Sequence, residues 1–373
     1  MGNLLGSPVT EKETETGITP DGLAFAVSSM QGWRVHMEDA HVAETSLSAI
    51  QGETSLPLPN HALFAVLDGH GGTFAASYGG RNLHRVLQHQ PAFFEYAKSV
   101  SDSSTTTSTT TQTTEPPTIL ERALQDALVA LDREVLLAVQ CSPVPDADLP
   151  APDESPDSGS TICVVLITPH WIVCANAGDS RAILGHNPLN VVPLSTDHKP
   201  EDDDEVARIR AAGGFVAAGR VEGDLAVSRG LGDYRYKEVA VVLAGSNGTS
   251  SNRTPASQKV SPVPDVTFTA RTPDDAFVLL ACDGIWDVQT NPQAAQLVST
   301  LFSEGERDLG LVCEEVCDTC LALGSKDNMT ALVVKCAGQV IGVGGGGVAE
   351  RRRQREAAAN PPEESPQETT TED

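Results

Sequence analysis

Six carboxylate residues stand in short, unusual sequence contexts that lie far apart along the chain. They are Glu38, Asp39, Asp68, Asp179, Asp283 and Asp327. Several of them follow an apolar run directly, where a carboxylate is poorly placed for ordinary solvation and well placed to converge on a site. Oxygen ligands of this kind suit hard cations such as Mg²⁺ and Mn²⁺. The pattern therefore predicts a metal-dependent hydrolase with a carboxylate-bound metal cluster.

Apolar runs supply the strands that would deliver these carboxylates. Residues 62–67 and 276–281 are continuous apolar segments of strand length, and they end just before Asp68 and Asp283. Further strands are predicted at residues 23–28, 161–167, 171–175, 181–184 and 331–335. Helices are predicted at residues 74–87, 120–135, 204–212, 293–301 and 309–323.

The predicted strands arrive in runs and do not alternate with helices. This order favours antiparallel sheets with helices packed outside them, an α+β layered domain, over a doubly wound parallel sheet. The carboxylates are separated by long stretches of chain, so one site must be assembled from several strand ends. We therefore expect one domain over residues 22–338.

The two ends of the chain and three internal segments look different from this domain. Residues 1–21 are polar and rich in Thr and Glu, and we expect a flexible leader. Residues 339–373 combine a glycine run with Arg, Pro, Glu and Thr, and we expect a disordered tail. The basic triplet in that tail is interpreted as solvated charge in preference to a docking element. Low-complexity insertions are expected near residues 101–118, 142–158 and 244–262.

The overall charge restricts the partners. The 373 residues carry a formal net charge of −26, which argues against nucleic acid and against adsorption to anionic membranes. Neither a secretory signal nor an apolar stretch of membrane-spanning length is seen, so we expect a cytoplasmic or nuclear location. Nothing in the sequence suggests an interface, and a monomer is expected. Gly2 fits N-myristoylation only in part, because position 6 is Gly; if modified, it would give peripheral membrane contact.

Nine segments, taken together and in this order, resemble the metal-dependent protein serine/threonine phosphatases of the 2C type. The resemblance covers roughly residues 22–337. The segments are residues 28–34, 37–41, 68–72, 177–181, 197–200, 223–229, 231–233, 282–287 and 327–329. It implies a sandwich of two antiparallel β-sheets flanked by helices, with the metal centre at one end. The chain departs from the family pattern at the insertions, and residues 238–262 are longer than expected near the family's regulatory flap.

The resemblance also implies the ligands of a centre that holds two Mg²⁺ or Mn²⁺ ions. It implies that Asp68 bridges both ions and that the carbonyl of Gly69 helps to hold one of them. The remaining ligands implied are Glu38, Asp283 and Asp327, with Asp39 as a supporting carboxylate. A third, weaker metal position is implied at Asp179 and Asp287.

The implied reaction is hydrolysis of phosphoserine and phosphothreonine on proteins by a metal-activated water. Arg34 fits a phosphate clamp, because a guanidinium can bond two phosphate oxygens at once. His70 resembles the family's general acid, which protonates the departing Ser or Thr oxygen. Phosphorylated proteins are therefore the expected partners.

Two other interpretations stay open. The first is a catalytically inactive, phosphatase-like scaffold that binds phosphoproteins; it predicts the loss of metal ligands or of Arg34, and all of them are present. The second is a different two-metal hydrolase such as a phosphodiesterase, although such sites usually recruit several His ligands and only His70 lies in a metal-site motif. Taken singly, an Asp-Gly pair is usually a turn. Asp197 and His198 are interpreted as structural.

Overall fold

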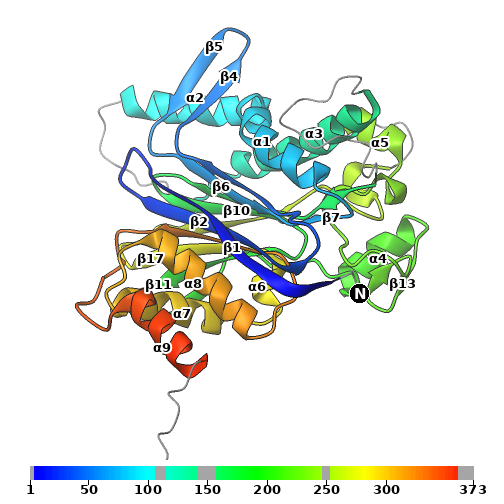
Figure 1. Cartoon of the computed structure of the whole chain (residues 1–373). Coiled ribbons are helices and arrows are strands. Elements are labelled where there is room, and N and C mark those ends of the chain that lie inside the picture. Colours follow the sequence, from blue (N-terminus) through cyan, green and yellow to red (C-terminus); the bar gives the residue numbers. More distant parts are fainter. Residues whose placement is uncertain (1–3, 106–114, 142–156, 246–252, 360–373) are drawn as a thin grey trace, which may run out of the picture.

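Two antiparallel β-sheets lie face to face at the centre of the molecule, and helices cover the outer face of each (Figure 1). The computed structural model describes residues 4–105, 115–141, 157–245 and 253–359. One six-stranded sheet has the order β1 (Leu4–Ile18), β2 (Ala24–Arg34), β18 (Met329–Lys335), β17 (Asp275–Ala281), β11 (Arg181–His186) and β12 (Val191–Pro193). The five-stranded sheet has the order β16 (Asp265–Ala270), β10 (Trp171–Ala177), β9 (Ile162–Ile167), β6 (Ala62–Leu67) and β3 (Ala40–Glu44).

Helices form the two outer layers. The five-stranded sheet packs against α1 (Phe74–Gln88), α2 (Pro91–Thr105) and α3 (Ile119–Cys141). The six-stranded sheet packs against α6 (Asp283–Trp286), α7 (Asn291–Ser303), α8 (Leu309–Ala322) and α9 (Gly347–Ala359). Sequence signals set the helix starts: Thr290 and Gln293 form a capping box before α7, and Asp308 caps α8. The predicted sandwich flanked by helices is confirmed.

The apolar runs of the central strands fill three cores. Every residue of β6 is buried, and successive side chains point to opposite faces of the sheet. Leu63, Ala65 and Leu67 pack toward α1–α3, whereas Phe64 and Val66 pack between the two sheets. A strand buried on both faces has no polar alternation, which is why β6, β9 and β17 appear in the sequence as continuous apolar runs.

Several shorter elements complete the described chain. A hairpin of β4 (Leu47–Gln51) and β5 (Thr54–Leu58) lies beside α2, and neither it nor α2 was predicted. Residues 203–245 and 253–262 form a segment that we call the flap segment. It contains α4 (Asp203–Ala211), β13 (Val216–Ala217), β14 (Arg220–Val221), β15 (Leu231–Gly232), α5 (Val239–Ala244) and two 3₁₀ turns (Tyr234–Tyr236 and Pro255–Ser257). No helix among the described residues is long and apolar enough to cross a membrane.

The flexible leader expected over residues 1–21 does not hold for Leu4–Ile18, which form the edge strand β1 paired along β2. The strand is polar because most of its side chains are exposed at a sheet edge, where charged residues are favoured. Lys12 lies 2.6 Å from Asp318 of α8, and Thr14 lies 3.0 Å from Ser28 of β2. Gly2 is outside the described residues.

The disordered tail expected over residues 339–373 does not hold for Gly347–Ala359, which form α9. Its arginines pair with acidic residues of the helices beneath: Arg351 with Glu304 at 2.9 Å, and Arg355 with the buried Glu315. Arg351 and Arg352 of the basic triplet therefore form ion pairs at the surface with residues of α7 and α8 or their ends, whereas Arg353 is 72% exposed and pairs only within α9. Of the predicted insertions, residues 106–114, 142–156 and 246–252 lie outside the described residues.

A fully buried ion pair ties α3 to the flap segment. The Lys237 ammonium lies 2.8 Å from Asp132 of α3, and both side chains are at most 1% exposed. Asp132 also accepts from the backbone N–H of Gly232 at 2.8 Å. These bonds fix the short segment from Gly232 to Lys237, which leads directly past Asp233.

Replacing Lys237 by Met should lower the free energy of unfolding by about 3–5 kcal/mol, because Asp132 would keep a buried charge without its cation. Urea denaturation followed by circular dichroism measures the change. The double variant Asp132→Asn with Lys237→Met should recover most of the loss, since Asn can still accept from Gly232. A Lys237→Met chain as stable as the wild type would contradict this account.

Candidate active site

The ends of four central strands meet at one end of the sandwich. Asp68 follows β6, Asp283 follows β17, and Asp327 precedes β18. Ala281 of β17 pairs with Ala331 of β18, and Met329 of β18 pairs with Met30 of β2, so the registers bring these strand ends side by side. The backbone N–H of Asp283 lies 3.4 Å from Oδ2 of Asp68, which joins residues 215 positions apart.

Asp39 and Asp68 approach each other closely inside this cluster. Ligand atoms of Asp39, Asp68 and the Cys282 thiol lie within 4.8 Å of one another. Oδ2 of Asp39 accepts from the Thr330 hydroxyl at 2.7 Å, whereas its buried Oδ1 has no hydrogen-bond partner among the described residues. Burial raises the pKa of Asp39 to about 6.

The neighbouring carboxylates raise one another's pKa values further. Burial, followed by the charges of Asp283 and Asp39, raises the pKa of Asp68 well above its ordinary value. Burial, followed by Asp179 and Asp327, does the same to the pKa of Asp283. The charges of Asp179 and Asp327 also raise the pKa of Asp68. Four of the predicted aspartates therefore act on Asp68 through their charges.

Asp179 and Asp287 lie on one side of the cluster. Asp179 is buried and lies 2.6 Å from the ammonium of Lys199, and its Oδ1 is buried without a partner among the described residues. Asp287 is exposed at the end of α6. Partial burial of its carboxyl group nevertheless raises the pKa of Asp287. The charge of Lys199 lowers this pKa, and the charge of Asp179 raises it.

Glu38, in the loop between β2 and β3, contacts the Gly-rich turn that begins at Gly69 after β6. Oε1 of Glu38 accepts from the backbone N–H of Gly72 at 2.8 Å. A Cβ atom at Gly69 would lie 2.2 Å from the carbonyl oxygen of Glu38, so only glycine allows the two segments to approach this closely. The turn thereby places Glu38 next to the strand end that carries Asp68.

Arg34 ends β2 and contacts Asp327 directly. Burial lowers the pKa of Arg34, but Asp327, Asp283 and Asp68 together raise it above its ordinary value. Its side chain is 41% exposed, so the guanidinium lies at the rim of the cluster. Only one of its nitrogens is bonded within the described part of the chain, which leaves N–H donors for an incoming oxyanion.

His70 contacts Asp233, a residue that the sequence analysis quoted in a motif but did not predict as part of the site. Its Nε2 lies 2.9 and 3.0 Å from the two carboxylate oxygens of Asp233. Burial lowers the pKa of His70, but the charge of Asp233 and its hydrogen bond raise it above the ordinary value. Asp233 has φ 54°, a left-handed conformation that Asp tolerates better than most residues.

A small three-stranded sheet creates this contact. Strand β8 (Gly159–Ser160) pairs with β7 (Gly69–His70) on one side and with β15 on the other, so His70 and Gly232 both lie opposite Gly159. A Cβ atom at Gly159 would lie 2.1 Å from Oδ2 of Asp233 and 2.4 Å from Nε2 of His70. Glycine at this position is therefore required for the His70–Asp233 pair.

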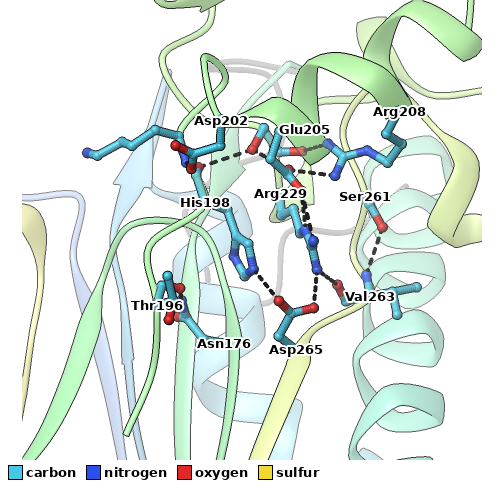
Figure 2. Close-up of polar contacts among 12 residues, drawn as sticks. Asn176, Thr196, His198, Asp202, Glu205, Arg208, Arg229, Ser261, Val263 and Asp265 are labelled. Atoms are coloured by element: carbon cyan, nitrogen blue, oxygen red, sulfur yellow. Dashed lines mark hydrogen bonds and ion pairs between the residues drawn. The ribbon is translucent and has the colours of Figure 1, made fainter. Parts of the chain in front are cut away.

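His198 holds the turn that carries Asp179. Its ring Nδ1 lies 3.2 Å from the backbone N of Gly178, and its backbone N–H donates to the Gly178 carbonyl at 3.0 Å. Its Nε2 lies 3.1 Å from Asp265 of β16 (Figure 2). The structural interpretation of His198 therefore agrees with its contacts, and Asp197 pairs with Arg181 at 2.7 Å.

Figure 2 shows how the flap segment is attached beside this histidine. Arg229 lies 2.6 Å from Asp265 and 2.7 Å from Glu205 of α4. Glu205 also pairs with Arg208 at 2.5 Å. Burial raises the pKa of Glu205, but Arg229 and Arg208 outweigh it and lower the value to about 2. This network joins α4 to the edge strand of the five-stranded sheet.

Comparisons with known proteins agree with this geometry. The family model described as "Protein phosphatase 2C" matches residues 23–329. Protein phosphatase 2C homolog 2 of Schizosaccharomyces pombe is 36% identical over 341 residues, which cover 90% of this chain and 78% of that protein. Protein phosphatase 2C homolog 2 of Hypocrea jecorina is 36% identical over 342 residues, which cover 90% of this chain and 67% of that protein.

The fold is also found among solved structures. The crystal structure of serine-threonine phosphatase 2C from Toxoplasma gondii superposes with a TM-score of 0.64 at 23% identity, over 87% of this chain and 99% of that one. At this identity the likeness concerns the fold. The family model and the curated relatives together decide the assignment: the chain belongs to the protein phosphatase 2C family of protein serine/threonine phosphatases.

Proposed function

We propose that the chain hydrolyses phosphoserine and phosphothreonine esters on proteins at a centre of two divalent cations, Mg²⁺ or Mn²⁺. One observation carries the proposal: half-buried carboxylates from several strand ends converge beside Arg34 and His70. The family is metal-dependent, and its members are protein phosphatases. The number and identity of the ions and the roles of individual residues are part of the proposal.

The residues present fit hard cations. Asp39 and Asp179 each have a buried carboxylate oxygen without a hydrogen-bond partner among the described residues, and an unpaired buried oxygen is costly. The charge of Asp283 raises the pKa of Asp68, and the charges of Asp179 and Asp327 raise that of Asp283; a cation would offset this repulsion. We propose Asp68 as the bridging ligand, with Glu38, Asp283, Asp327 and the Gly69 carbonyl completing the centre and Asp39 supporting it.

A third, weaker cation position is proposed at Asp179 and Asp287. The ammonium of Lys199 lies 2.6 Å from Asp179, so the chain already places a positive charge there. An ion at this position would compete with Lys199 for the same carboxylate, which agrees with a weaker site. When bound at the centre, divalent ions lower the pKa of water and offset the charge of a phosphate.

Phosphoester hydrolysis also needs a group that binds the phosphate and an acid that protonates the leaving oxygen, and Arg34 and His70 would supply these two functions. Arg34 would bind phosphate oxygens with the N–H donors that Asp327 leaves free. His70 would protonate the departing serine or threonine oxygen. Because its Nε2 is held by Asp233, Nδ1 is the ring atom left to deliver the proton. Asp233 would keep the ring oriented and favour its protonated form.

The inactive-scaffold alternative finds no support in this arrangement, because each residue implied for metal and phosphate binding is present and near the cluster. We propose phosphorylated proteins as the partners. We also keep the proposals of a monomer and of a cytoplasmic or nuclear location, which were made from the sequence alone.

Asp68→Asn should lower metal-dependent hydrolysis of p-nitrophenyl phosphate by roughly a hundredfold or more, a loss typical when charge stabilisation at the reacting group is removed. Activity is measured with added Mn²⁺, and EDTA should abolish it in the wild type. Asp274→Asn, the same change at an exposed residue, is the matched control. Near-normal turnover by a folded Asp68→Asn chain would refute the assignment.

The metal-free chain should lose stability as the pH rises through about 6, the pKa of Asp39. The folded chain holds this proton more tightly than the unfolded chain, whose Asp pKa is roughly 3.9, so the stabilisation is complete below that value. The pKa values of Asp68 and Asp283 are also raised, so these residues add to the loss of stability as the pH rises. Urea denaturation in EDTA at about pH 5 and about pH 8 measures the loss.

Asp39→Asn should reduce this pH dependence, since one of the contributing carboxylates is removed. Added Mn²⁺ should reverse the trend for the wild type, because metal ligands must be ionised. An Asp39→Asn chain that loses as much stability as the wild type over this pH range would show that Asp39 does not contribute.

Asp233→Asn should shift the alkaline limb of the pH–rate profile for a phosphoserine peptide to lower pH. The Asp233 charge raises the pKa of His70, so its removal lets His70 lose its proton sooner. We expect kcat near pH 8 to fall by about tenfold, with recovery toward acidic pH. p-Nitrophenyl phosphate, whose leaving group needs no proton, serves as the control. An unshifted profile would argue against this role of Asp233.

A further inference from the structure

A small basic cavity lies in the flap segment, apart from the carboxylate cluster. It has a volume of about 170 Å³, enough for one phosphate or carboxylate group. Its lining includes the cations Arg235, Lys237, Arg253 and Lys259, the anion Glu238 and the amide residue Gln258. We call this cavity the flap pocket.

Gln258 gives the flap pocket an unused donor. The residue is 3% exposed, and its Oε1 accepts from the backbone N–H of Glu238 at 2.5 Å. Its Nε2 is buried and has no hydrogen-bond partner in the described parts of the chain. An amide donor in this position is costly to leave unpaired, and an oxyanion is the kind of ligand that would accept from it.

The two arginines of the flap pocket also keep donors free, whereas the Lys259 ammonium pairs with Glu222 at 2.5 Å. Arg253 pairs with Glu238 and donates to the Ala212 carbonyl through a single nitrogen, Nη1. Arg235 pairs with Asp224 at 3.1 Å, again through Nη1 alone. Across the described residues the other guanidinium N–H groups of both side chains make no further bond, and guanidinium donors match the oxygens of phosphate and carboxylate.

The position of the flap pocket relates it to catalysis. Asp233, which contacts His70, is two residues before Arg235 and four before Lys237. The buried Lys237–Asp132 pair fixes this stretch of chain. Figure 1 shows α4 and α5 on the same side of the molecule as β7, which carries His70. A peptide held at the carboxylate cluster can therefore extend toward this pocket.

We propose that the flap pocket binds a second anionic group of the substrate, a phosphate or an acidic side chain near the scissile phosphoester. This inference rests on the proposed function. It assigns to the chain a preference for phosphoproteins with acidic or multiply phosphorylated sequences. Arg235, Arg253 and Lys259 are each paired with a carboxylate of the chain, so recognition would rest on the remaining N–H donors and on Gln258 and not on a net positive charge.

The test compares peptides that share one phosphoserine and differ in their flanks. One peptide has alanine flanks, and in the others a glutamate or a second phosphoserine is moved along the flank. For the best acidic peptide, Arg253→Gln with Lys259→Met should lower kcat/KM about tenfold, mainly through KM. The alanine-flanked peptide and p-nitrophenyl phosphate should be turned over as by the wild type.

Gln258→Glu provides a second variant with little change in shape. It keeps an acceptor for the Glu238 N–H and replaces the free donor by an anion, so it should remove the preference for acidic flanks. Arg122→Gln with Lys98→Met removes the same charge at two exposed residues of α3 and α2 and is the matched control. Circular dichroism verifies that each variant folds.

The outcomes separate cleanly. The inference is overturned if no acidic flank improves the wild-type reaction, if the pocket variants weaken all peptides equally, or if the control variant acts like them. Fluorescence anisotropy of the labelled peptides in EDTA reads binding without turnover. A wild type that binds acidic flanks more tightly than the pocket variants, yet hydrolyses no peptide, would support the flap pocket and contradict the proposed function.

Discussion

Electrostatic repulsion among converging carboxylates is the constraint on which the rest of the molecule depends. Asp39, Asp68 and Asp283 lie at the ends of different strands, and burial together with the charges of neighbouring carboxylates raises their pKa values. Such a cluster persists only if rigid elements hold its members in place. The fully buried strands β6 and β17, locked between three apolar cores, supply that rigidity. The β-sandwich therefore holds the carboxylates in place against their repulsion.

Positive groups around the cluster moderate this charge in different ways. Arg34 contacts Asp327 from the rim, and Lys199 contacts the buried Asp179. His70 contacts a carboxylate of its own, Asp233, through Nε2. The small sheet around Gly159 sets that pairing, since any larger residue there would force His70 and Asp233 apart. Backbone spacing thus decides which acids join the carboxylate cluster and which one contacts the histidine.

The flap segment is anchored at two places, and this links substrate contact to the active site. The Glu205–Arg229–Asp265 network attaches α4 to the five-stranded sheet (Figure 2). The Lys237–Asp132 pair attaches the following stretch to α3. Arg235, which lines the flap pocket, lies two residues after Asp233 in this stretch of chain. Because the flap segment is attached at both places, the flap pocket would bind a flanking group of a substrate at a fixed distance from the scissile bond.

The sequence by itself determined the local features: buried strands that end in an acid, the helices with apolar faces, and the motifs that carry Arg34, His70 and the aspartates. It could not reveal the role of Asp233, because only the pairing of β7, β8 and β15 brings it to His70. It also missed β1 and α9, whose polar sequences are stabilised by a neighbouring strand and by ion pairs to distant residues such as Glu304 and Glu315. Local patterns report what a segment can bury, whereas tertiary structure alone decides which distant charges and backbone groups it meets.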